Sequence, residues 1–311
     1  MTGPFAFEED FVYIRSMSST YSTKAYAKIN LFLRLCGKYP NGYHRLFTLM
    51  QEVSVADDIK VTIDSEAEDE IIVANCVEGL RQEDDLCYKA AVKYVDLIDA
   101  RDYGRITIEV NKNIPSQAGM GGGSSDAASV IKLLQKRFGN PLTKEELVKL
   151  GKELGADVPF FFFGKSAFCE GIGEKVTGCK DLSGLPLLIV KPKEGVSTPV
   201  CFKMCDENPP VFDEDKYKKD IKDILDKNEE ATKRVRKVSD ILINDMQGPA
   251  CEILPVIGGI IEDLKATKPI YTAMSGSGSA VFAVYETTEE RDRALARINK
   301  GDHLVIPCET I

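Results

Sequence analysis

The chain has 311 residues, 43% of them hydrophobic, which is enough to fill the cores of two domains of ordinary size. It carries 49 acidic against 40 basic residues and a formal net charge of −9, so no global attraction to nucleic acid or to an anionic membrane is expected. The longest apolar runs, such as residues 185–190, are far shorter than the about 20 residues that cross a bilayer. A membrane-spanning protein is therefore excluded, and any phosphate-bearing ligand must be met by local features.

The nine cysteines are scattered, with no Cys-x-x-Cys pair, and their odd number gives no paired disulfide framework. We expect reduced thiols, which favours a cytoplasmic location. Cys201 and Cys205 are four residues apart, but the chain has only two histidines, His44 and His303, so no zinc-type cluster is predicted. Small buried apolar side chains are the favoured interpretation of these cysteines.

The N-terminal segment has neither the basic start nor the apolar stretch of a secretory signal, and its residues 8–10 are all acidic. We expect residues 1–22 to form a disordered leader. A first domain is predicted at residues 23–182 and a second at residues 183–311, because turn-forming residues near Gly184 precede a new strand pattern.

The first predicted element is a strand at residues 24–35, where apolar and polar residues alternate with a period of two. One face of this strand carries Lys28 and Asn30 side by side. The strand ends in a turn rich in Gly, Pro and Asn at residues 37–42, so the Tyr-His pair at residues 43–44 should begin the returning segment.

Further strands are predicted at residues 46–55 and 59–63. A helical pattern at residues 84–100 starts with aspartates that can cap it, and a strand at residues 105–110 follows. A glycine-rich loop then runs directly into a helical pattern at residues 127–138.

Beyond this helix, Thr143 and Glu146 form a capping box for a helix that ends at Gly155. The apolar residues 160–168 are predicted to be a strand. The second half opens with a strand at residues 187–190. It continues through a charge-rich stretch, residues 206–237, which we interpret as a solvated helix surface without a function. Helices follow this stretch, and residues 271–285 come after them.

The loop at residues 119–125 has four glycines in five positions immediately before a helix. Glycines let the backbone approach an anion closely, and the helix start supplies free N–H groups and a positive dipole end, so a phosphate site is predicted. A flexible turn is the alternative. The loop is neither a Walker A motif, since no Gly-Lys-Ser/Thr ends it, nor a Rossmann fingerprint, since Ser124 stands where the third glycine belongs.

A phosphoryl transferase without a Walker lysine needs a cation elsewhere in the chain. The candidates are Lys28 and Lys112. A lone lysine on a strand, such as Lys28, is more often a solvated residue at the edge of a sheet. Asp157, in a turn after a helix, is a plausible acceptor for the proton of a substrate hydroxyl. No histidine lies near Asp157 in sequence, which disfavours a Ser-His-Asp hydrolase. A second glycine-rich segment, residues 274–280, is interpreted either as a tight loop or as a partner of the first loop that donates N–H groups to the ligand.

At these residues the chain closely resembles the GHMP kinase superfamily, whose motifs match residues 27–31, 115–128 and 274–282. The match extends from about residue 24 to residue 285. It implies an α+β protein of two lobes. The N-terminal ATP-binding domain would resemble the second domain of ribosomal protein S5, the C-terminal domain would be ferredoxin-like, and the active site would lie in the cleft between them.

Within the superfamily, residues 25–33, 42–44 and 154–161 are similar to the branch that phosphorylates the 2-hydroxyl of 4-diphosphocytidyl-2-C-methyl-D-erythritol in non-mevalonate isoprenoid biosynthesis. The resemblance implies ATP as phosphoryl donor, Mg²⁺, and a small-molecule partner bearing a cytidine diphosphate group. A monomer or a weak homodimer is expected, with no nucleic-acid or membrane partner.

The resemblance also implies roles for individual residues. Asp157 is implied to be the catalytic base, or a group that orients the hydroxyl, with Lys28 as its electrostatic partner. The nucleotide-binding residues are implied to be Asp85, Leu86, Lys112, Pro115, Gly119, Met120, Gly121, Gly122, Gly123, Ser124 and Ser125, with Ser124 near Mg²⁺. The acceptor-binding residues are implied to be Asn30, Tyr43, His44, Asp157, Phe202, Gly276, Ser277 and Gly278.

Two positions depart from the family pattern: Met120 stands where leucine is usual, and Asp126 where many members have asparagine. The second change adds a negative charge to the first helical turn, so the side chain of Asp126 is expected to point away from phosphate.

The nearest alternative function is that of a homoserine or mevalonate kinase, which the Tyr-His pair at residues 43–44 disfavours. A non-catalytic ligand sensor is the rival from another class, disfavoured by the presence of both Lys28 and Asp157.

Overall fold

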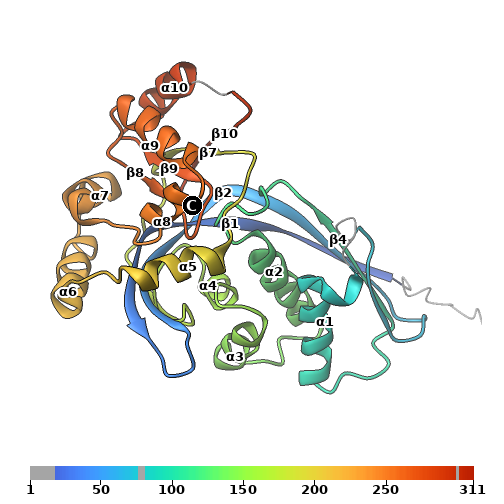
Figure 1. Cartoon of the computed structure of the whole chain (residues 1–311). Coiled ribbons are helices and arrows are strands. Elements are labelled where there is room, and N and C mark those ends of the chain that lie inside the picture. Colours follow the sequence, from blue (N-terminus) through green and yellow to red (C-terminus); the bar gives the residue numbers. More distant parts are fainter. Residues whose placement is uncertain (1–17, 76–80, 299–300) are drawn as a thin grey trace, which may run out of the picture.

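The computed structural model describes residues 18–75, 81–298 and 301–311, and within these ranges the chain forms two lobes, each built on one sheet (Figure 1). The N-terminal lobe holds a sheet whose described strands are β1 (Ser18–Lys38), β2 (His44–Asp64), β3 (Glu70–Val73), β4 (Arg105–Asn111), β5 (Ser166–Gly171) and β6 (Lys175–Gly178). Strands β1 and β2 form a long antiparallel hairpin. The other edge of β2 pairs with β4 at one end and with β5 at the other.

Helix α2 (Gly122–Arg137) of the N-terminal lobe packs against both strands of the hairpin, and the other helices of this lobe pack around α2 on the same side of the sheet (Figure 1). These other helices are η1 (Gln82–Asp84), α1 (Leu86–Leu97), α3 (Lys144–Leu154) and α4 (Val158–Phe163). The predicted capping box of α3 is confirmed, because the Thr143 hydroxyl accepts from Glu146 N while the Glu146 carboxylate accepts from Thr143 N.

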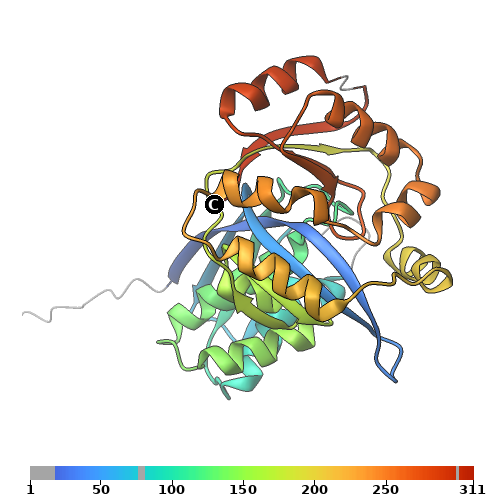
Figure 2. The same cartoon turned by 90° about the vertical axis from the view of Figure 1, so that its left-hand side faces the viewer.

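The C-terminal lobe holds a sheet of β7 (Pro186–Lys191), β8 (Tyr271–Met274), β9 (Val281–Val284) and β10 (Leu304–Glu309). Its order is β10-β7-β9-β8, and every pair is antiparallel. The helices after β7 are α5 (Thr198–Glu207), α6 (Glu214–Leu225), α7 (Ala231–Val238), η2 (Ser239–Ile241), α8 (Gln247–Ile253), α9 (Val256–Ala266) and α10 (Thr288–Arg297). The strand order with α9 and α10 as crossovers is ferredoxin-like, as expected. Figure 2 shows this lobe stacked on the first.

The two lobes share apolar contacts and main-chain hydrogen bonds. One core cluster contains Phe32 and Phe47 of the hairpin together with Ile189 and Phe282 of the second sheet. Leu33 of β1 donates its N–H to Ile243 O at 3.0 Å and accepts from Asp245 N at 2.9 Å. The lobes are therefore joined across the hairpin by a shared core and by main-chain hydrogen bonds. A boundary after residue 182 stays a prediction.

Three predicted boundaries are corrected. Strand β1 begins at Ser18, inside the expected leader, because its first residues pair with the end of β2; residues 1–17 of that leader lie outside the described chain. The two strands expected at residues 46–55 and 59–63 are one continuous strand, β2. Helix α2 begins at Gly122, inside the glycine run rather than after it.

The strand expected at residues 160–168 is wrong for its first half. Residues 158–163 form helix α4, followed by strand β5. Pro159 lies in the first turn of α4, where its missing N–H costs nothing, and Phe160 and Phe161 are buried. A short apolar run cannot by its periodicity distinguish a buried helix turn from a strand. In the part of the chain that the structure describes, no helix has the length and apolarity needed to cross a membrane.

Candidate active site

A cleft of about 1210 Å³ lies between the lobes, bordered by the β1–β2 hairpin, the start of α2, the turn before α4 and the N-terminal half of α5. The sequence-predicted residues that line it are Lys28, Asn30, Tyr43, His44, Gly119, Gly121, Ser124, Asp157, Phe202, Gly276, Ser277 and Gly278. Residues from three separate motifs thus meet in one cavity. This arrangement is what a shared site requires, although the role of each residue stays a prediction.

Two residues that line the cleft, Lys28 and Asp157, form an ion pair. Lys28 Nζ lies 3.3 Å from Asp157 Oδ2, and the side chain of the lysine is only 4% exposed against 31% for the aspartate. Asp157 is the N-cap residue of α4 but accepts no capping hydrogen bond, so its carboxylate is available to face the cleft. A buried ammonium beside a partly exposed carboxylate can offset negative charge while the carboxylate accepts a proton.

Asn30 fixes the position of the lysine from the same face of β1. Lys28 Nζ donates to Asn30 Oδ1 at 2.6 Å, and Asn30 Nδ2 donates to Thr48 Oγ1 on β2 at 2.9 Å. Thr48 in turn donates to Phe32 O at 2.5 Å. Both the oxygen and the nitrogen of the Asn30 amide therefore have partners, and this chain of hydrogen bonds leaves Lys28 little freedom to move.

The glycine-rich loop is shaped by close backbone approaches at two glycines. At Gly119, with φ +70°, an added Cβ would lie 2.1 Å from Ser275 O; at Gly121, with φ +69°, it would lie 3.1 Å from Lys28 Cγ and from Phe161 Cζ. Side chains at either position would separate the elements that build the cleft. Gly121 is also the N-cap residue of α2, so the free N–H groups of the first turn open beside the Lys28 ion pair.

The second glycine-rich segment packs against the first, as one of the two interpretations predicted. Ser279 N donates to Gln117 O and Ala280 N to Ala118 O, each at 3.2 Å, and Ser275 Oγ donates to Gly119 O at 2.9 Å. The two loops are thus joined across the lobes. Donation of N–H groups from this segment to a ligand stays a prediction.

Several predicted residues lie outside the cleft: Asp85, Leu86, Lys112, Pro115, Met120, Gly122, Gly123 and Ser125. Met120 is 1% exposed and belongs to the core, so only its backbone can face a nucleotide. The Ser125 hydroxyl donates to Tyr26 O at 2.7 Å, which ties α2 to β1 and leaves that proton engaged. Gly123, by contrast, is exposed at the first turn of α2, with open space around it.

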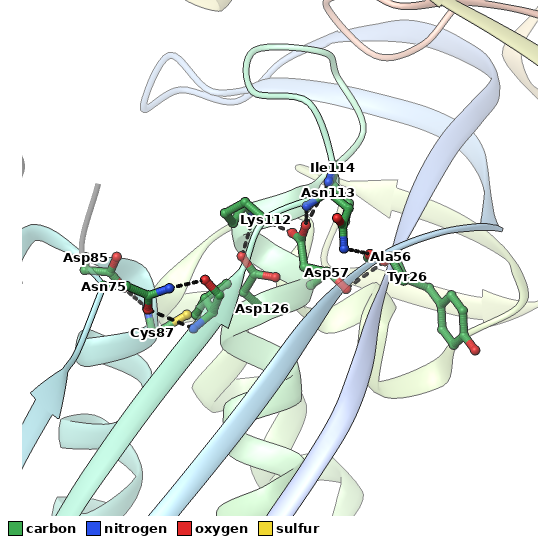
Figure 3. Close-up of polar contacts among 12 residues, drawn as sticks. Tyr26, Ala56, Asp57, Asn75, Asp85, Cys87, Lys112, Asn113, Ile114 and Asp126 are labelled. Atoms are coloured by element: carbon green, nitrogen blue, oxygen red, sulfur yellow. Dashed lines mark hydrogen bonds and ion pairs between the residues drawn. The ribbon is translucent and has the colours of Figure 1, made fainter. Parts of the chain in front are cut away.

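Lys112 lies between two carboxylates near the start of α2, as Figure 3 shows. Its Nζ donates to Asp57 Oδ2 and, at 2.7 Å, to Asp126 Oδ2. The fully buried Asp57 also accepts from Asn113 N at 2.5 Å and Ile114 N at 2.7 Å, so it anchors the strand end that precedes the glycine-rich loop. Among the residues that the structure describes, Asp126 Oδ1 is buried without a hydrogen-bond partner.

Asp85 and the start of α1 lie close to the same cluster (Figure 3). The Asp85 carboxylate accepts from Cys87 N at 2.7 Å and caps α1. The starts of α1 and α2 are therefore surrounded by the charged residues Lys112, Asp126 and Asp85. None of these three residues lines the cleft. The predicted border of an adenine pocket at Asp85 and Leu86 stays a prediction.

The buried carboxyl of Asp126 predicts a pH-dependent stability. Burial raises the pKa of Asp126 to about 7, because the attraction of the half-exposed Lys112 only partly offsets the lost solvation. In the unfolded chain the carboxyl has its ordinary pKa of about 4, so it is ionised at a lower pH than in the folded protein. The free energy of unfolding therefore falls as the pH rises from about 4 to 7, and the full loss is present above pH 7. Asp126→Asn should therefore raise the Tm at pH 8 by roughly 2–5 °C.

Thermal melts of both proteins at pH 5 and pH 8 test this expectation. The gain from Asp126→Asn should shrink at pH 5, where the native aspartic acid is neutral too. A gain of equal size at both pH values would show instead that the amide finds better hydrogen bonds, and a loss at pH 8 would show that the ion pair with Lys112 outweighs burial.

Aromatic rings also line the cleft. The rings of His44 and Phe202 are stacked at 4.3 Å with an angle of 18° between their planes, and Tyr43 beside them is 61% exposed. His44 Nε2 lies 2.8 Å from Asp206 Oδ1, a contact that the sequence analysis did not foresee because the stretch beginning at Asp206 was interpreted as solvated surface. Because the rings of His44 and Phe202 are in direct contact, a planar base bound here would stack on an outer face of the aromatic group, beside the exposed Tyr43, and not between the two rings.

The chain matches two family models. One is described as the GHMP kinases N terminal domain and matches residues 85–165, and the other as GHMP kinases C terminal and matches residues 230–303. A protein of Desulfitobacterium hafniense named 4-diphosphocytidyl-2-C-methyl-D-erythritol kinase is 35% identical over 273 residues, covering 88% of this chain and 89% of that protein. A protein of the same name from Clostridium beijerinckii is 38% identical over 265 residues, covering 85% and 90%.

Solved structures of two kinases have a similar fold. A crystal structure of 4-(cytidine 5'-diphospho)-2C-methyl-D-erythritol kinase is similar with a TM-score of 0.72 and 29% identity, covering 94% of this chain and 100% of that one. A homoserine kinase from Cytophaga hutchinsonii is similar with a TM-score of 0.70 at 13% identity, covering 96% and 97%. The second likeness concerns the fold alone.

Proposed function

The chain belongs to the GHMP kinase family and is an ATP-dependent small-molecule kinase, and from this premise we propose that its acceptor is 4-diphosphocytidyl-2-C-methyl-D-erythritol, phosphorylated on the 2-hydroxyl. The observation that carries the proposal is the position of the Lys28–Asp157 pair. It lies in one cleft with both the glycine-rich loop before α2 and the stacked rings of His44 and Phe202. The loop offers a phosphate site and the rings offer a site for a base.

In the proposed reaction the acceptor hydroxyl lies against Asp157, which takes its proton or orients it while the oxygen attacks the γ-phosphorus of ATP. The bond from that phosphorus to the bridging oxygen breaks, and ADP leaves with the electron pair. Lys28 offsets the negative charge that builds up between the attacking oxygen and the phosphoryl group. Asn30 holds the ammonium of Lys28 in place through its 2.6 Å hydrogen bond. Backbone N–H groups at the first turn of α2 bind the phosphates that stay on the nucleotide.

Mg²⁺ is proposed to accompany ATP. Among the residues that the structure covers, no group of three or more His, Cys, Asp and Glu side chains could hold a metal ion. The Ser124 hydroxyl lines the cleft at the first turn of α2 and is a suitable oxygen ligand, with phosphate oxygens and water completing the shell. The bound ion supplies positive charge to the phosphates.

The proposed location is the cytoplasm. The cysteines that the structure describes are all free, and Cys87, Cys169, Cys201, Cys205 and Cys308 are buried as small apolar side chains. Reduced, unpaired thiols of this kind are typical of proteins that work in a reducing compartment. This supports the location expected from the sequence.

An acceptor panel tests the proposed function. ADP release by the purified chain should be measured with 4-diphosphocytidyl-2-C-methyl-D-erythritol, mevalonate and homoserine at equal concentrations. We expect kcat/KM for the cytidine-bearing acceptor to exceed the others by a factor on the order of 10⁴, because a site built to hydrogen-bond a base rejects acceptors that lack one. A higher kcat/KM for mevalonate or homoserine would overturn the proposed acceptor. Nucleotide binding without turnover of any acceptor would support the sensor interpretation.

A further inference from the structure

Asp206 joins the two lobes beside His44, a residue that lines the cleft. Asp206 lies near the end of α5, and its carboxylate reaches two residues of the β1–β2 hairpin on the other lobe. Oδ1 lies 2.8 Å from His44 Nε2, and Oδ2 lies 2.5 Å from Lys38 Nζ. Lys38 and His44 are paired at the end of the hairpin, so one carboxylate contacts both sides of its turn.

The contact with Asp206 determines which nitrogen of His44 carries the proton. The Lys38 ammonium, and after it His44, hold the pKa of Asp206 below its usual range, so the carboxylate is ionised near neutral pH and only accepts hydrogen bonds. His44 Nε2 must therefore be the donor. In a neutral imidazole the other nitrogen, Nδ1, then has a free lone pair, and within the described chain it has no hydrogen-bond partner.

The ring of His44 is also held in orientation. Phe202 stacks on one face at 4.3 Å, and the side chain of His44 is 14% exposed where it lines the cleft. Stacking sets the plane of the ring, and the hydrogen bond to Asp206 sets its rotation within that plane. Nδ1 is thus a preorganised acceptor on a residue that lines the cleft.

We infer that Asp206 is a positioning residue that holds His44 with Nδ1 as an acceptor toward the cleft, and thereby selects a base with an amino group over one with a carbonyl at that place. Cytosine presents an N4 amino donor, whereas uracil presents a carbonyl oxygen whose lone pairs would face that of Nδ1. The inference rests on the proposed function for the identity of the acceptor. Its content is the role of Asp206, which no motif in the sequence indicated.

The test compares Asp206→Ala with wild type on the cytidine acceptor and on its uridine analogue. We expect the KM for the cytidine acceptor to rise about 5- to 30-fold, the scale of one hydrogen bond in a desolvated site, with kcat and the KM for ATP unchanged. The ratio of kcat/KM for cytidine over uridine should fall by a similar factor. Glu207→Ala is the matched control, because Glu207 is the next residue of α5, equally charged and exposed, and does not line the cleft.

A double mutant separates positioning from a direct or structural effect. If Asp206 acts through His44, adding Asp206→Ala to His44→Ala should leave the KM and the cytidine preference of His44→Ala unchanged. A further loss in the double mutant would overturn the inference, as would an unchanged cytidine-to-uridine ratio in Asp206→Ala.

The ¹⁵N chemical shifts of the imidazoles in the unmutated protein give a readout that needs no activity. The chain has only two histidines, so His303→Ala assigns the signals of His44. A protonated Nε2 and an unprotonated Nδ1 are the expected tautomer, and the reverse tautomer would overturn the inference. Failure of the wild type to phosphorylate the cytidine acceptor would instead overturn the proposed function, while the nitrogen shifts would still decide how His44 is held.

Discussion

Asp157→Asn should reduce kcat by about 10²–10⁴-fold, the contribution that a positioned general base usually makes, while both substrates still bind. The change is nearly isosteric and keeps a hydrogen-bonding group, but it removes the carboxylate that can accept the hydroxyl proton. The carboxylate makes no capping bond to α4, so its loss should not weaken the helix start. Single-turnover phosphorylation with saturating ATP and acceptor measures the effect directly.

A matched control is Asp213→Asn, which makes the same change at an N-cap position of α6 outside the cleft. Asparagine caps helices as well as aspartate does, so kcat and Tm should stay at wild-type values. Near wild-type kcat in Asp157→Asn itself would end the catalytic assignment.

Lys28→Met should lower kcat through the same step, because Lys28 Nζ lies 3.3 Å from the Asp157 carboxylate and faces the developing charge. The effects of the two substitutions should therefore not add, and the double mutant should be little worse than the more damaged single mutant. A loss equal to the product of the two single-mutant factors would show that the two residues act on separate steps.

The pH–rate profile separates a true base from an orienting group. If Asp157 accepts the proton, the loss of kcat toward low pH in the wild type should be absent from Asp157→Asn. If it only orients the hydroxyl, the mutant should keep the shape of the wild-type profile at a lower rate. Phosphoryl transfer depends largely on positioning and electrostatics, so both behaviours are chemically reasonable.

The sequence predicted the local features of the fold well because each rests on a local rule. The period-two pattern of β1, the capping box at Thr143 and the glycine run before α2 all depend on neighbouring residues, and the structure has them. Where a pattern was ambiguous the prediction failed: the apolar run at residues 158–163 fits a buried helix turn as well as a strand, and tertiary packing decided in favour of α4.

The parts of the candidate site that the sequence did not indicate are contacts between residues far apart in the chain. Asp206 lies 162 positions from His44 and within a charge-rich stretch, so neither spacing nor composition distinguishes it from the solvated acids around it. In the Asp57–Lys112–Asp126 cluster, the sequence singled out Lys112 and Asp126 but did not indicate Asp57 or the contacts that join this strand, loop and helix. Such contacts exist only once the lobes and their loops are packed, so no local rule of the sequence predicts them.

Gly123→Val should weaken ATP binding by a factor on the order of 10²–10³ without unfolding the protein, because losing one or two hydrogen bonds to a charged group costs about 1.5–3 kcal/mol each. Gly123 is the second residue of α2, and an ideal Cβ there meets nothing within 4 Å. The new side chain would therefore be accommodated by the protein but would occupy the space in front of the N–H groups where phosphates are expected. Titration calorimetry with a non-hydrolysable ATP analogue measures the affinity.

Gly259→Val provides the control, since Gly259 lies in α9, also has nothing within 4 Å of an ideal Cβ, and is exposed away from the cleft. Valine has a slightly higher helix propensity than glycine, so both variants should have a Tm equal to or a little above that of the wild type. Only Gly123→Val should lose nucleotide affinity. Equal affinities in the two folded variants would mean that the glycines of the loop serve the packing of Lys28, Phe161 and Ser275 alone, and that the phosphates bind elsewhere in the cleft.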